Sequence, residues 1–542
     1  MRTLSWLACA TALAPAAAAV SQTIAQSVPG SPTDLLIGKP RDALPRPQAE
    51  APLPADVVTV PETVQSAGII KGVVFDGVDP PVSVADAARP FLDKPITLES
   101  VQGLARALSD AYAETSIALF TVNVPAQSFE GGVVHIQILE GFVEHTTIVG
   151  ETDARSLSLV KRYATEMTGK RPLSKRVLQR YLSLIRDIPG LTVETKLLRG
   201  SAPGGVQLYL GLNQKGHEVS FSYNNLTQRA LANGEFGVTG KLYGALRPGD
   251  QTSLTLSSAT DLKAFRYAGI SHSTPLIDGS QFSAAFGHIE TRQQPFDIRG
   301  NATVASVGVS YPVIRGYQRN ANVSAVIDGV NSDNAVLGSL LVRERTRAAR
   351  LSASFGESGE RHSVSASVVG AKGIDILGAE TALTGNDVGF AKLVATAAAS
   401  RAFGKALAVR VEAAGQLSGS ALPAVERFLI GGDRFGRAFP VATLAADQGS
   451  AASAEVAWLP FRKGSLARSE LYVFGDRAAV RYNQRGLIPV QSFNLASAGA
   501  GVKVQFRDKA TLRAELARRV DKPFPTTDNW QVNLAWRLSL GR

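Results

Sequence analysis

The sequence predicts a β protein, a transmembrane barrel of about sixteen strands preceded by two small α+β modules. Three observations lead to this fold class. The final 326 residues (542 − 216 = 326) alternate apolar and polar residues, and the part before them repeats the order β-α-α-β-β. After Val20 the sequence contains no run of eighteen apolar residues, so no membrane-spanning helix is expected there. Because only helices and closed barrels satisfy their backbone in lipid, an exported chain of this kind is either soluble or a barrel.

Residues 1–25 have the pattern of a cleaved signal peptide. Arg2 supplies a basic start, Leu4–Val20 is mostly apolar, and small residues suited to signal peptidase follow. Cys9, the only cysteine, lies inside this segment, so we expect none in the mature chain. Disulfides, thiolate metal sites and cysteine nucleophiles are thereby excluded. The formal charge of +11 comes from dispersed residues, which argues against nucleic acid as a partner.

Residues 26–66 are expected to form a linker. The stretch from 31 to 65 is rich in alanine and proline. The prolines are Pro32, Pro40, Pro45, Pro47, Pro52, Pro54 and Pro61. Such a composition is typical of a semi-extended connection. Thr33–Ile37 could form a short helix, but the composition favours the linker.

The first module is predicted over residues 67–142. It begins with a strand that carries Ile69, Val73 and Phe75, and a short helix follows at about 84–89. Thr97 is expected to cap a second helix with an apolar face. That face consists of Val101, Leu104, Leu108 and Tyr112. Strands at about 118–124 and 133–139 complete the module.

The same order recurs over residues 143–216. A strand at 146–149 is followed by a helix at 155–167 and a second helix capped by Ser174. The expected apolar face of that second helix is Val177, Tyr181, Leu184 and Ile188. Strands at 191–198 and 206–212 follow. The segment Lys94–Thr97 reappears as Arg171–Ser174, a shift of 172 − 95 = 77 residues, which indicates two copies of one unit.

Residues 217–542 show the period of two that strands produce. The clearest stretch is the last, where six apolar residues alternate with Gln531, Asn533, Ala535, Arg537 and Ser539. The apolar residues are Trp530, Val532, Leu534, Trp536, Leu538 and Leu540. A soluble β-sandwich would alternate in the same way. The length and the charges that recur on the polar face favour a barrel with a wet lumen, with room for about sixteen strands.

Together these features resemble the transporters of two-partner secretion, the hemolysin and filamentous-hemagglutinin secretion and activation family, and the modules resemble POTRA domains. In the first module Pro125 and Gln127 are similar to a proline-x-glutamine turn, and Glu140 and Gly141 to a closing glutamate-glycine. Four residues of the second module also match the family pattern. They are Arg171 and Pro172 before its second helix, and Pro189 and Gly190 after it.

The segment Ile430–Phe439 resembles the family's loop that folds into the barrel. Gly431 and Gly432 match its double glycine, and Arg437 and Phe439 match the tip, valine-arginine-glycine-phenylalanine. Gly436 replaces the valine and Ala438 replaces the glycine. The predicted loop spans roughly 418–449, a length that is usually functional or disordered.

A second family motif, phenylalanine-x-aspartate-x-glycine, is matched by Phe474 and Asp476, with Ala478 in place of the glycine. Alternation places Asp476 on the lumen face of its strand. The resemblance implies that Arg437 pairs with this carboxylate; the alternative is an ordinary solvated loop arginine. Family barrels usually end on an aromatic residue, whereas this sequence ends on Leu540–Arg542. Trp536, or the strand as a whole, could serve instead.

The sequence gives no indication of catalysis. It contains no phosphate loop, no histidine pair at metal spacing and no nucleophile elbow, so we expect no catalytic, cofactor or metal site. The resemblance implies an outer-membrane conduit with periplasmic modules. Its expected partners are an unfolded exoprotein, outer-membrane lipid, and the barrel-assembly machinery during biogenesis. A barrel-assembly factor of the wider superfamily is the main alternative, and a diffusion porin is a weaker one.

Overall fold

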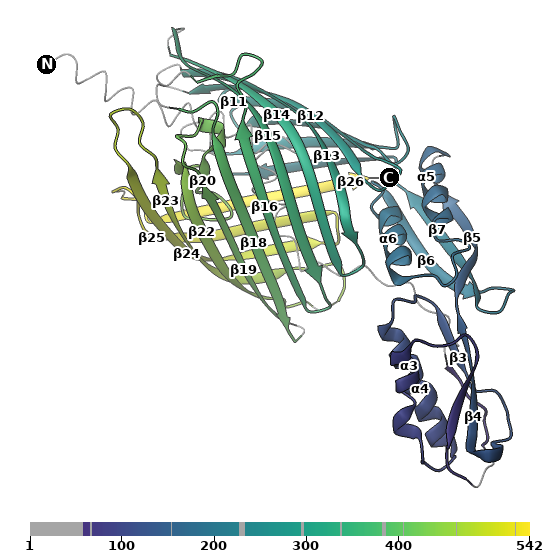
Figure 1. Cartoon of the computed structure of the whole chain (residues 1–542). Helices are drawn as coiled ribbons and strands as arrows, with labels where there is room; N and C mark the ends of the chain where they lie inside the picture. The colour runs from purple at the N-terminus through teal and green to yellow at the C-terminus, as the bar shows by residue number, and fades with distance from the viewer. Residues whose placement is uncertain are drawn as a thin grey trace. The chain divides into compact units, whose positions relative to one another are not determined.

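The computed structural model describes residues 58–64, 68–152, 154–226, 233–293, 298–336, 339–381, 386–404, 406–461, 463–525 and 527–541. The expected signal peptide and the possible helix at Thr33–Ile37 lie outside these residues. The chain divides into two compact units (Figure 1). A module unit reaches to Gln214 and includes Arg315–Tyr317, and a barrel unit comprises residues 215–314 and 318–542.

The first module packs helices on one four-stranded sheet. Its elements are β1 (Val58–Thr59), β2 (Gly72–Gly77), α3 (Val82–Asp86), η1 (Arg89–Phe91), α4 (Leu98–Glu114), β3 (Phe120–Asn123), η2 (Glu130–Gly132) and β4 (Val133–Glu140). The strand order is β1-β3-β4-β2. Strand β1 pairs in parallel with β3, although its residues fall in the range expected to be linker. The range expected to be a semi-extended linker therefore contains one short strand that the sequence did not predict, which gains backbone hydrogen bonds from the sheet edge.

Helix α4 forms as its sequence predicts. The Thr97 side chain accepts a hydrogen bond from the Ser100 N–H, and the Ser100 side chain accepts one from the Thr97 N–H. This capping box satisfies two donors that the first turn of a helix leaves free. The four predicted apolar side chains are all fully buried. They are Val101, Leu104, Leu108 and Tyr112.

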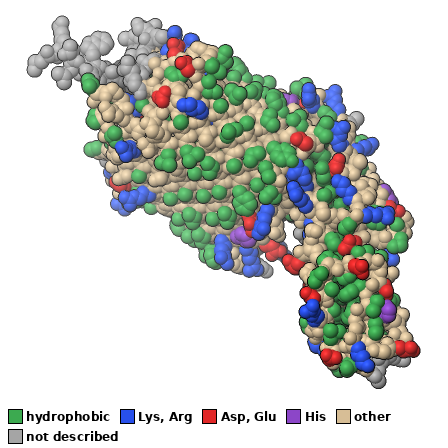
Figure 2. Space-filling model, viewed as in Figure 1, with side chains coloured by type: hydrophobic (Ala, Val, Ile, Leu, Met, Phe, Trp, Pro, Cys, Tyr) green, Lys and Arg blue, Asp and Glu red, His purple; other side chains and the backbone are tan. Residues whose placement is uncertain are grey.

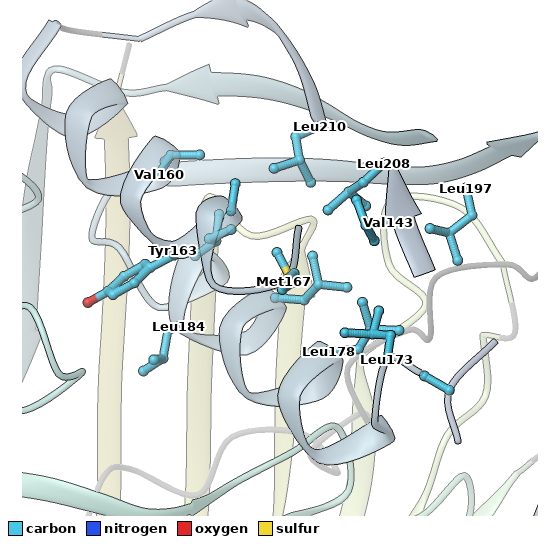
Figure 3. Packing of buried hydrophobic residues seen from close by; sticks show 14 of the residues in the cluster. Val143, Val160, Tyr163, Met167, Leu173, Leu178, Leu184, Leu197, Leu208 and Leu210 are labelled. Atoms are coloured by element: carbon cyan, nitrogen blue, oxygen red, sulfur yellow. The ribbon is translucent and has the colours of Figure 1, made fainter. Parts of the chain in front are cut away.

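The second module is a three-stranded sheet of order β5-β7-β6 covered by two helices. Its elements are β5 (Phe142–Glu151), α5 (Ala154–Thr165), α6 (Lys175–Arg186), β6 (Leu191–Arg199) and β7 (Gly205–Gln214). Ser174 caps α6, as predicted. The predicted apolar face of α6 was partly wrong, because Leu178, Leu182 and Ile185 are buried more deeply than Val177 and Tyr181. The face is rotated toward the sheet by about one residue position, and Figure 3 shows Leu178 and Leu184 in this core.

The barrel unit is one closed antiparallel sheet whose last strand pairs with its first. Its first strands are β8 (His217–Asn224), β9 (Glu235–Tyr243), β10 (Gln251–Ala259), β11 (Phe265–Pro275), β12 (Gln281–Gln293), β13 (Ile298–Arg315), β14 (Arg319–Val336), β15 (Ser339–Ser358) and β16 (His362–Gly373). The others are β17 (Glu380–Thr381), β18 (Ala391–Phe403), β19 (Leu407–Leu417), β22 (Gln448–Trp458), β23 (Glu470–Tyr482), β24 (Gln491–Phe506), β25 (Ala510–Asp521) and β26 (Trp530–Gly541). Since β17 continues the position of β16 beside β15, the described residues fill sixteen strand positions, and the predicted fold class is confirmed.

The barrel strands present an apolar face outward. On β26 the six apolar residues of the alternating pattern are all exposed, whereas Asn533 between them is 2% exposed. Figure 2 shows hydrophobic side chains spread over the visible outer face of these strands. Charged residues on the opposite face, such as Arg350, Glu455 and Glu515, are buried inside. This is the arrangement that a lipid-facing barrel requires. Among the described residues, no helix is long and apolar enough to cross a membrane.

Candidate functional site: the loop inside the barrel

The connection between β19 and β22, residues 418–447, is here called the pore loop. It contains η3 (Ala424–Glu426) and a separate hairpin of β20 (Phe428–Ile430) and β21 (Leu444–Ala446). We call Leu422–Glu426 its base and Gly436–Phe439 its tip. Loop side chains contact strand residues that alternate with the exposed, lipid-facing ones, so the loop lies against the inner wall of the barrel. The predicted loop therefore exists, within two residues of its expected limits.

Asp476 holds the tip through the loop backbone. Its Oδ1 accepts the N–H of Gly436 at 2.6 Å, and its Oδ2 accepts the N–H of Arg437 at 3.4 Å. The Ser497 hydroxyl of β24 donates to the same carboxylate at 2.5 Å. Asp476 is 6% exposed on the face of β23 opposite Leu471 and Val473, as alternation predicts. The carboxylate thus fixes the direction in which the tip backbone runs.

The Arg437 guanidinium pairs with different carboxylates from the one that the resemblance implied. Its Nη1 donates to Glu455 of β22 at 3.0 Å, and its Nε and Nη2 donate to Glu515 of β25. The expected side-chain pair between Arg437 and Asp476 is therefore wrong, because Asp476 is already occupied by backbone N–H groups. The alternative of a solvated arginine is wrong as well, since Arg437 is 1% exposed.

Aromatic rings complete the arginine site. The guanidinium carbon lies 3.5 Å from the centroid of the Phe474 ring and 5.4 Å from that of Tyr472. The Tyr472 hydroxyl donates to Glu515 at 2.7 Å, and Asn533 donates to the Arg437 carbonyl at 2.8 Å. Stacking on a ring face uses the planar guanidinium in a way that an ammonium group would not reproduce. The Phe474 position matched from sequence is therefore part of the same site as Arg437.

The glycines of the loop motif adopt backbone conformations that other residues avoid. Gly431 and Gly432 have φ values of 107° and 113°, and Gly436 has a φ of 75°. A Cβ on Gly431 would lie 2.1 Å from the Pro440 carbonyl oxygen. Gly436, which stands where the family has valine, uses the left-handed region to turn its N–H toward Asp476. Phe439 is buried in the apolar cluster beneath the tip.

Among the carboxylates that hold the loop, Glu426, Glu455 and Glu515 could not be singled out from the sequence. Glu455 and Glu515 lie on the polar face of alternating strands, so alternation could have placed them in the lumen but could not have chosen them as partners. Glu426 lies in η3, where neither a motif nor a period marks it. All three are at most 4% exposed.

The predicted motif residues of the first module serve its fold. The Gln127 side chain donates to the His135 carbonyl at 2.7 Å and accepts the His135 N–H at 2.8 Å, so it pairs with β4 as a backbone would. The N–H of Gly141 donates to the Leu119 carbonyl at 2.6 Å. Glu140 lies near Tyr112, where burial and then the nearby carboxylate raise the pKa of Tyr112 to about 12. Pro125 precedes the turn that presents Gln127.

The predicted motif residues of the second module lie at the two ends of α6. The Arg171 guanidinium lies 3.5 Å from the centroid of the Phe142 ring, and Pro172 follows it before the Ser174 cap. Pro189 and Gly190 follow the helix, and Gly190 adopts a φ of 75°. The motifs of the second module therefore serve its fold, whereas the loop motif lies in the barrel lumen.

Comparison with known proteins gives two family matches. The model for haemolysin secretion/activation proteins ShlB/FhaC/HecB matches residues 279–504, and the model for ShlB-type POTRA domains matches residues 69–141. The heme/hemopexin transporter protein HuxB of Haemophilus influenzae is 25% identical over 206 residues, which cover 38% of this chain and 36% of that protein. The match thus spans about a third of the length of the curated relative.

Solved structures show the same fold. CdiB from Escherichia coli superposes with a TM-score of 0.70 at 16% identity, covering 92% of this chain and 94% of that one. CdiB from Acinetobacter baumannii gives a TM-score of 0.62 at 16% identity, covering 92% and 95% of the two chains. BamA from Haemophilus ducreyi lacking POTRA domains 1–3 gives 0.52 at 13% identity, covering 88% and 100%.

A closed sixteen-stranded barrel with an internal loop, preceded by POTRA modules, defines an outer-membrane protein whose modules lie in the periplasm. The two family matches support a two-partner secretion transporter with POTRA modules and a barrel, similar to the haemolysin secretion/activation proteins.

Proposed function

We propose that this protein recognises one large exoprotein in the periplasm and secretes it, unfolded, through the barrel. The observation that carries the proposal is the pore loop, which lies inside the closed barrel and is held there by side-chain and backbone contacts that can be released without breaking a covalent bond. A loop that occupies the resting lumen and shifts aside would let an extended chain pass. Folding of the exoprotein outside the cell would then draw it outward.

The first module offers a surface for capturing an extended chain. Among the described residues, β2 pairs with β4 on one side and lies at the end of the strand order, so its other edge is free. An extended segment can add to such an edge through main-chain hydrogen bonds, which need no particular sequence. Val74 of β2 is 41% exposed beside this edge. We propose that the exoprotein adds a strand here.

The barrel seam favours transport through the lumen over assembly of proteins into the membrane. Delivery into lipid requires an opening in the barrel wall, whereas β26 and β8 pair without a break from Ala535–Asn224 to Gly541–Glu218. A barrel-assembly factor remains the alternative function. A diffusion porin is disfavoured because it would have no use for modules with a free sheet edge.

The proposal is tested by expressing the protein together with the product of any neighbouring reading frame that encodes a large exported protein. The intact chain should deliver that protein to the medium, and deletion of residues 68–141 should abolish delivery while the barrel still inserts. Insertion is checked by the change in gel mobility between unheated and heated samples. Normal export by the deletion would contradict recognition by the first module. If the deletion leaves the amount of exoprotein in the medium unchanged but impairs the insertion of other outer-membrane proteins, the assembly function is favoured.

Capture at β2 has its own test. A photo-crosslinking residue at Val74 should trap the exoprotein during secretion, whereas the same residue at the exposed Arg106 of α4 should not. The two sites lie in one module, so they share local concentration and differ in whether they lie beside the free edge. Equal crosslinking at both sites would contradict strand addition.

A further inference from the structure

Four charged side chains meet at the base of the pore loop. Asp328 of β14, Arg350 of β15 and Lys392 of β18 point inward from the wall, and Glu426 comes from the loop. Each side chain is at most 2% exposed. Two positive and two negative groups make the cluster neutral. Such a desolvated cluster is stable only when every partner is present.

Glu426 is the member that joins the loop to the wall. Its carboxylate accepts from Arg350 Nη2 at 2.6 Å and Nη1 at 3.1 Å, and lies 2.9 Å from Lys392 Nζ. Its backbone carbonyl accepts from Lys392 at 2.7 Å and from Gln416 at 3.1 Å. Arg350 in turn donates to Asp328 at 2.5 and 3.0 Å. One loop residue therefore receives hydrogen bonds from three strand residues.

The backbone on either side of Glu426 is held as well. Glu344 of β15 accepts the N–H of Ala424 at 3.0 Å, and Asp447 accepts the N–H of Leu422 at 2.7 Å. Asp447 lies at the far end of the loop and also pairs with Arg485 at 2.6 and 2.9 Å. The start and the end of the loop are thus tied to each other and to the wall.

The base and the tip use different parts of the barrel. The base contacts side chains on β15, β18 and β19, and through Arg350 it is linked to Asp328 of β14. The tip contacts side chains on β22 to β26. The partners named for Glu426 do not include any of those named for Arg437. Between base and tip lie Gly431 and Gly432, both with positive φ. Glycines at such a position can absorb a change in backbone direction.

We propose that Glu426 is a positioning residue which keeps the base of the pore loop fixed on the wall while the tip is released, so that the loop turns about its glycines. The anchoring role of Glu426 does not depend on the proposed function; only the movement of the loop during secretion rests on it. The two anchors act independently. Loss of Glu426 frees the base and leaves the tip in place, and loss of Arg437 does the reverse.

Buried wall residues beneath the loop report on each anchor. Ala371 of β16 clusters with Leu422 of the base and is 5% exposed, and Leu495 of β24 lies against Gly436 of the tip and is fully buried. Because Cys9 is the only cysteine and lies in the expected signal peptide, Ala371→Cys and Leu495→Cys each give a single thiol. A small, membrane-impermeant thiol reagent measures the accessibility of each site in the purified, folded barrel.

In the resting protein, Glu426→Gln should raise the labelling rate at Ala371→Cys by about tenfold or more and leave Leu495→Cys protected, because removal of one partner from a buried cluster releases the segment that carried it. Arg437→Ala should give the opposite pattern. Glu426→Asp, which keeps a carboxylate for Arg350 and Lys392, should restore part of the protection at Ala371→Cys, which a loss of folding would not allow. Protection of Ala371→Cys in the Glu426→Gln variant would contradict an anchor at Glu426. Exposure of both sites by either variant would contradict the independence of the base and the tip.

During secretion in cells, Leu495→Cys should become reactive while Ala371→Cys stays protected. If both sites become reactive together, the loop leaves as one piece and the fixed base is wrong. If exoprotein reaches the medium while Leu495→Cys stays protected, the tip does not move during secretion. Both the loop shift of the proposed function and the movement about the glycines would then be wrong. The labelling rates of the Glu426→Gln variant in the resting protein would still show whether the base and the tip are anchored independently.

Discussion

In the periplasmic modules, helices bury aliphatic side chains against a sheet, whereas inside the barrel the pore loop is held by arginine, lysine and carboxylate groups that are buried just as deeply. The first module's core is built on residues such as Ile70, Leu104 and Ile136, all fully buried. The barrel interior buries Arg437 and Glu426 to within 1% of complete burial. The same degree of burial is thus reached with opposite chemistry.

The difference teaches what each region is suited to do. Apolar packing has no direction, so it suits a module whose core keeps one fold while its sheet edge serves the proposed binding. A buried charge cluster is stabilising when all partners meet and costly when one is missing. Such a cluster defines one position of a loop sharply and penalises intermediate positions. The barrel interior therefore holds the pore loop in one sharply defined position.

The largest expected effect comes from removing the cation at the tip. Arg437→Ala leaves Glu515 buried without its arginine partner, and Glu455 keeps Arg410. Removal of one member of a buried ion pair typically costs about 3–5 kcal/mol. The loop should become mobile, with higher pore conductance and slowed or lost secretion per inserted barrel. Arg437→Lys should recover little, because an ammonium group cannot bridge both carboxylates and stack on Phe474.

The matched control is Arg468→Ala, which breaks the ion pair with Asp508. The two side chains are 38% and 80% exposed, so this pair contributes at most about 1 kcal/mol. Conductance and secretion should stay at the wild-type level. Equal effects of Arg437→Ala and Arg468→Ala would mean that burial of the charge is irrelevant.

An apolar truncation in the first module should destabilise that module alone. Leu108→Ala removes a fully buried side chain of α4, and such changes cost about 2–5 kcal/mol. Proteolysis of the modules should accelerate, while the heat-modifiable gel mobility of the barrel stays unchanged. A shift in barrel mobility would show that the two kinds of core are not energetically separate.

Removal of the α4 cap should have a smaller effect of the same kind. Thr97→Ala deprives the Ser100 N–H of its acceptor and should cost about 0.5–2 kcal/mol. Thr97→Ser keeps the hydroxyl and serves as the control. Proteolysis of the modules at several denaturant concentrations would rank the three proteins, and a ranking with Thr97→Ser least stable would contradict the cap.

The smallest expected effects are opposite responses to pH in the two modules. Hydrogen bonds from Ser201 and then Ala202 hold the pKa of Glu144 below its ordinary range, whereas burial raises the pKa of Glu140. The stability that Glu144 contributes is present above the ordinary glutamate pKa of about 4.3 and is lost as pH falls through its lowered value. Glu140 favours its protonated form in the fold, so its contribution falls as pH rises from the ordinary pKa through the raised one.

Single variants separate these two responses. Glu144→Gln should flatten the acid limb of second-module stability, and Glu140→Gln should flatten the decline above the ordinary glutamate pKa in the first. Hydrogen exchange at pH 3 to 6, read separately for each module, measures both. The same response from both modules in the wild-type protein would contradict the assignment.

The comparison also explains which parts of the structure could be predicted from sequence. The apolar face of α4 and the outward face of β26 follow from a period of 3.6 or 2, and burial of apolar groups enforces that period. The partner of Arg437 could not be predicted, because Glu455, Asp476 and Glu515 all lie on inward faces and only the three-dimensional position of the loop decides among them. Glu426 has no periodic neighbours, so its role depends wholly on tertiary contacts.

The pairing of β26 with β8 has a consequence for the order of biogenesis. The Asn225 side chain donates to the carbonyl of Val532, a residue 307 positions away, so closure joins segments that are made at very different times. Contacts of such high contact order form late. Asn533 of the same strand donates to the Arg437 carbonyl, so the strand that seals the wall also completes the tip site. The complete tip site therefore forms only when β26 has taken its place in the barrel wall.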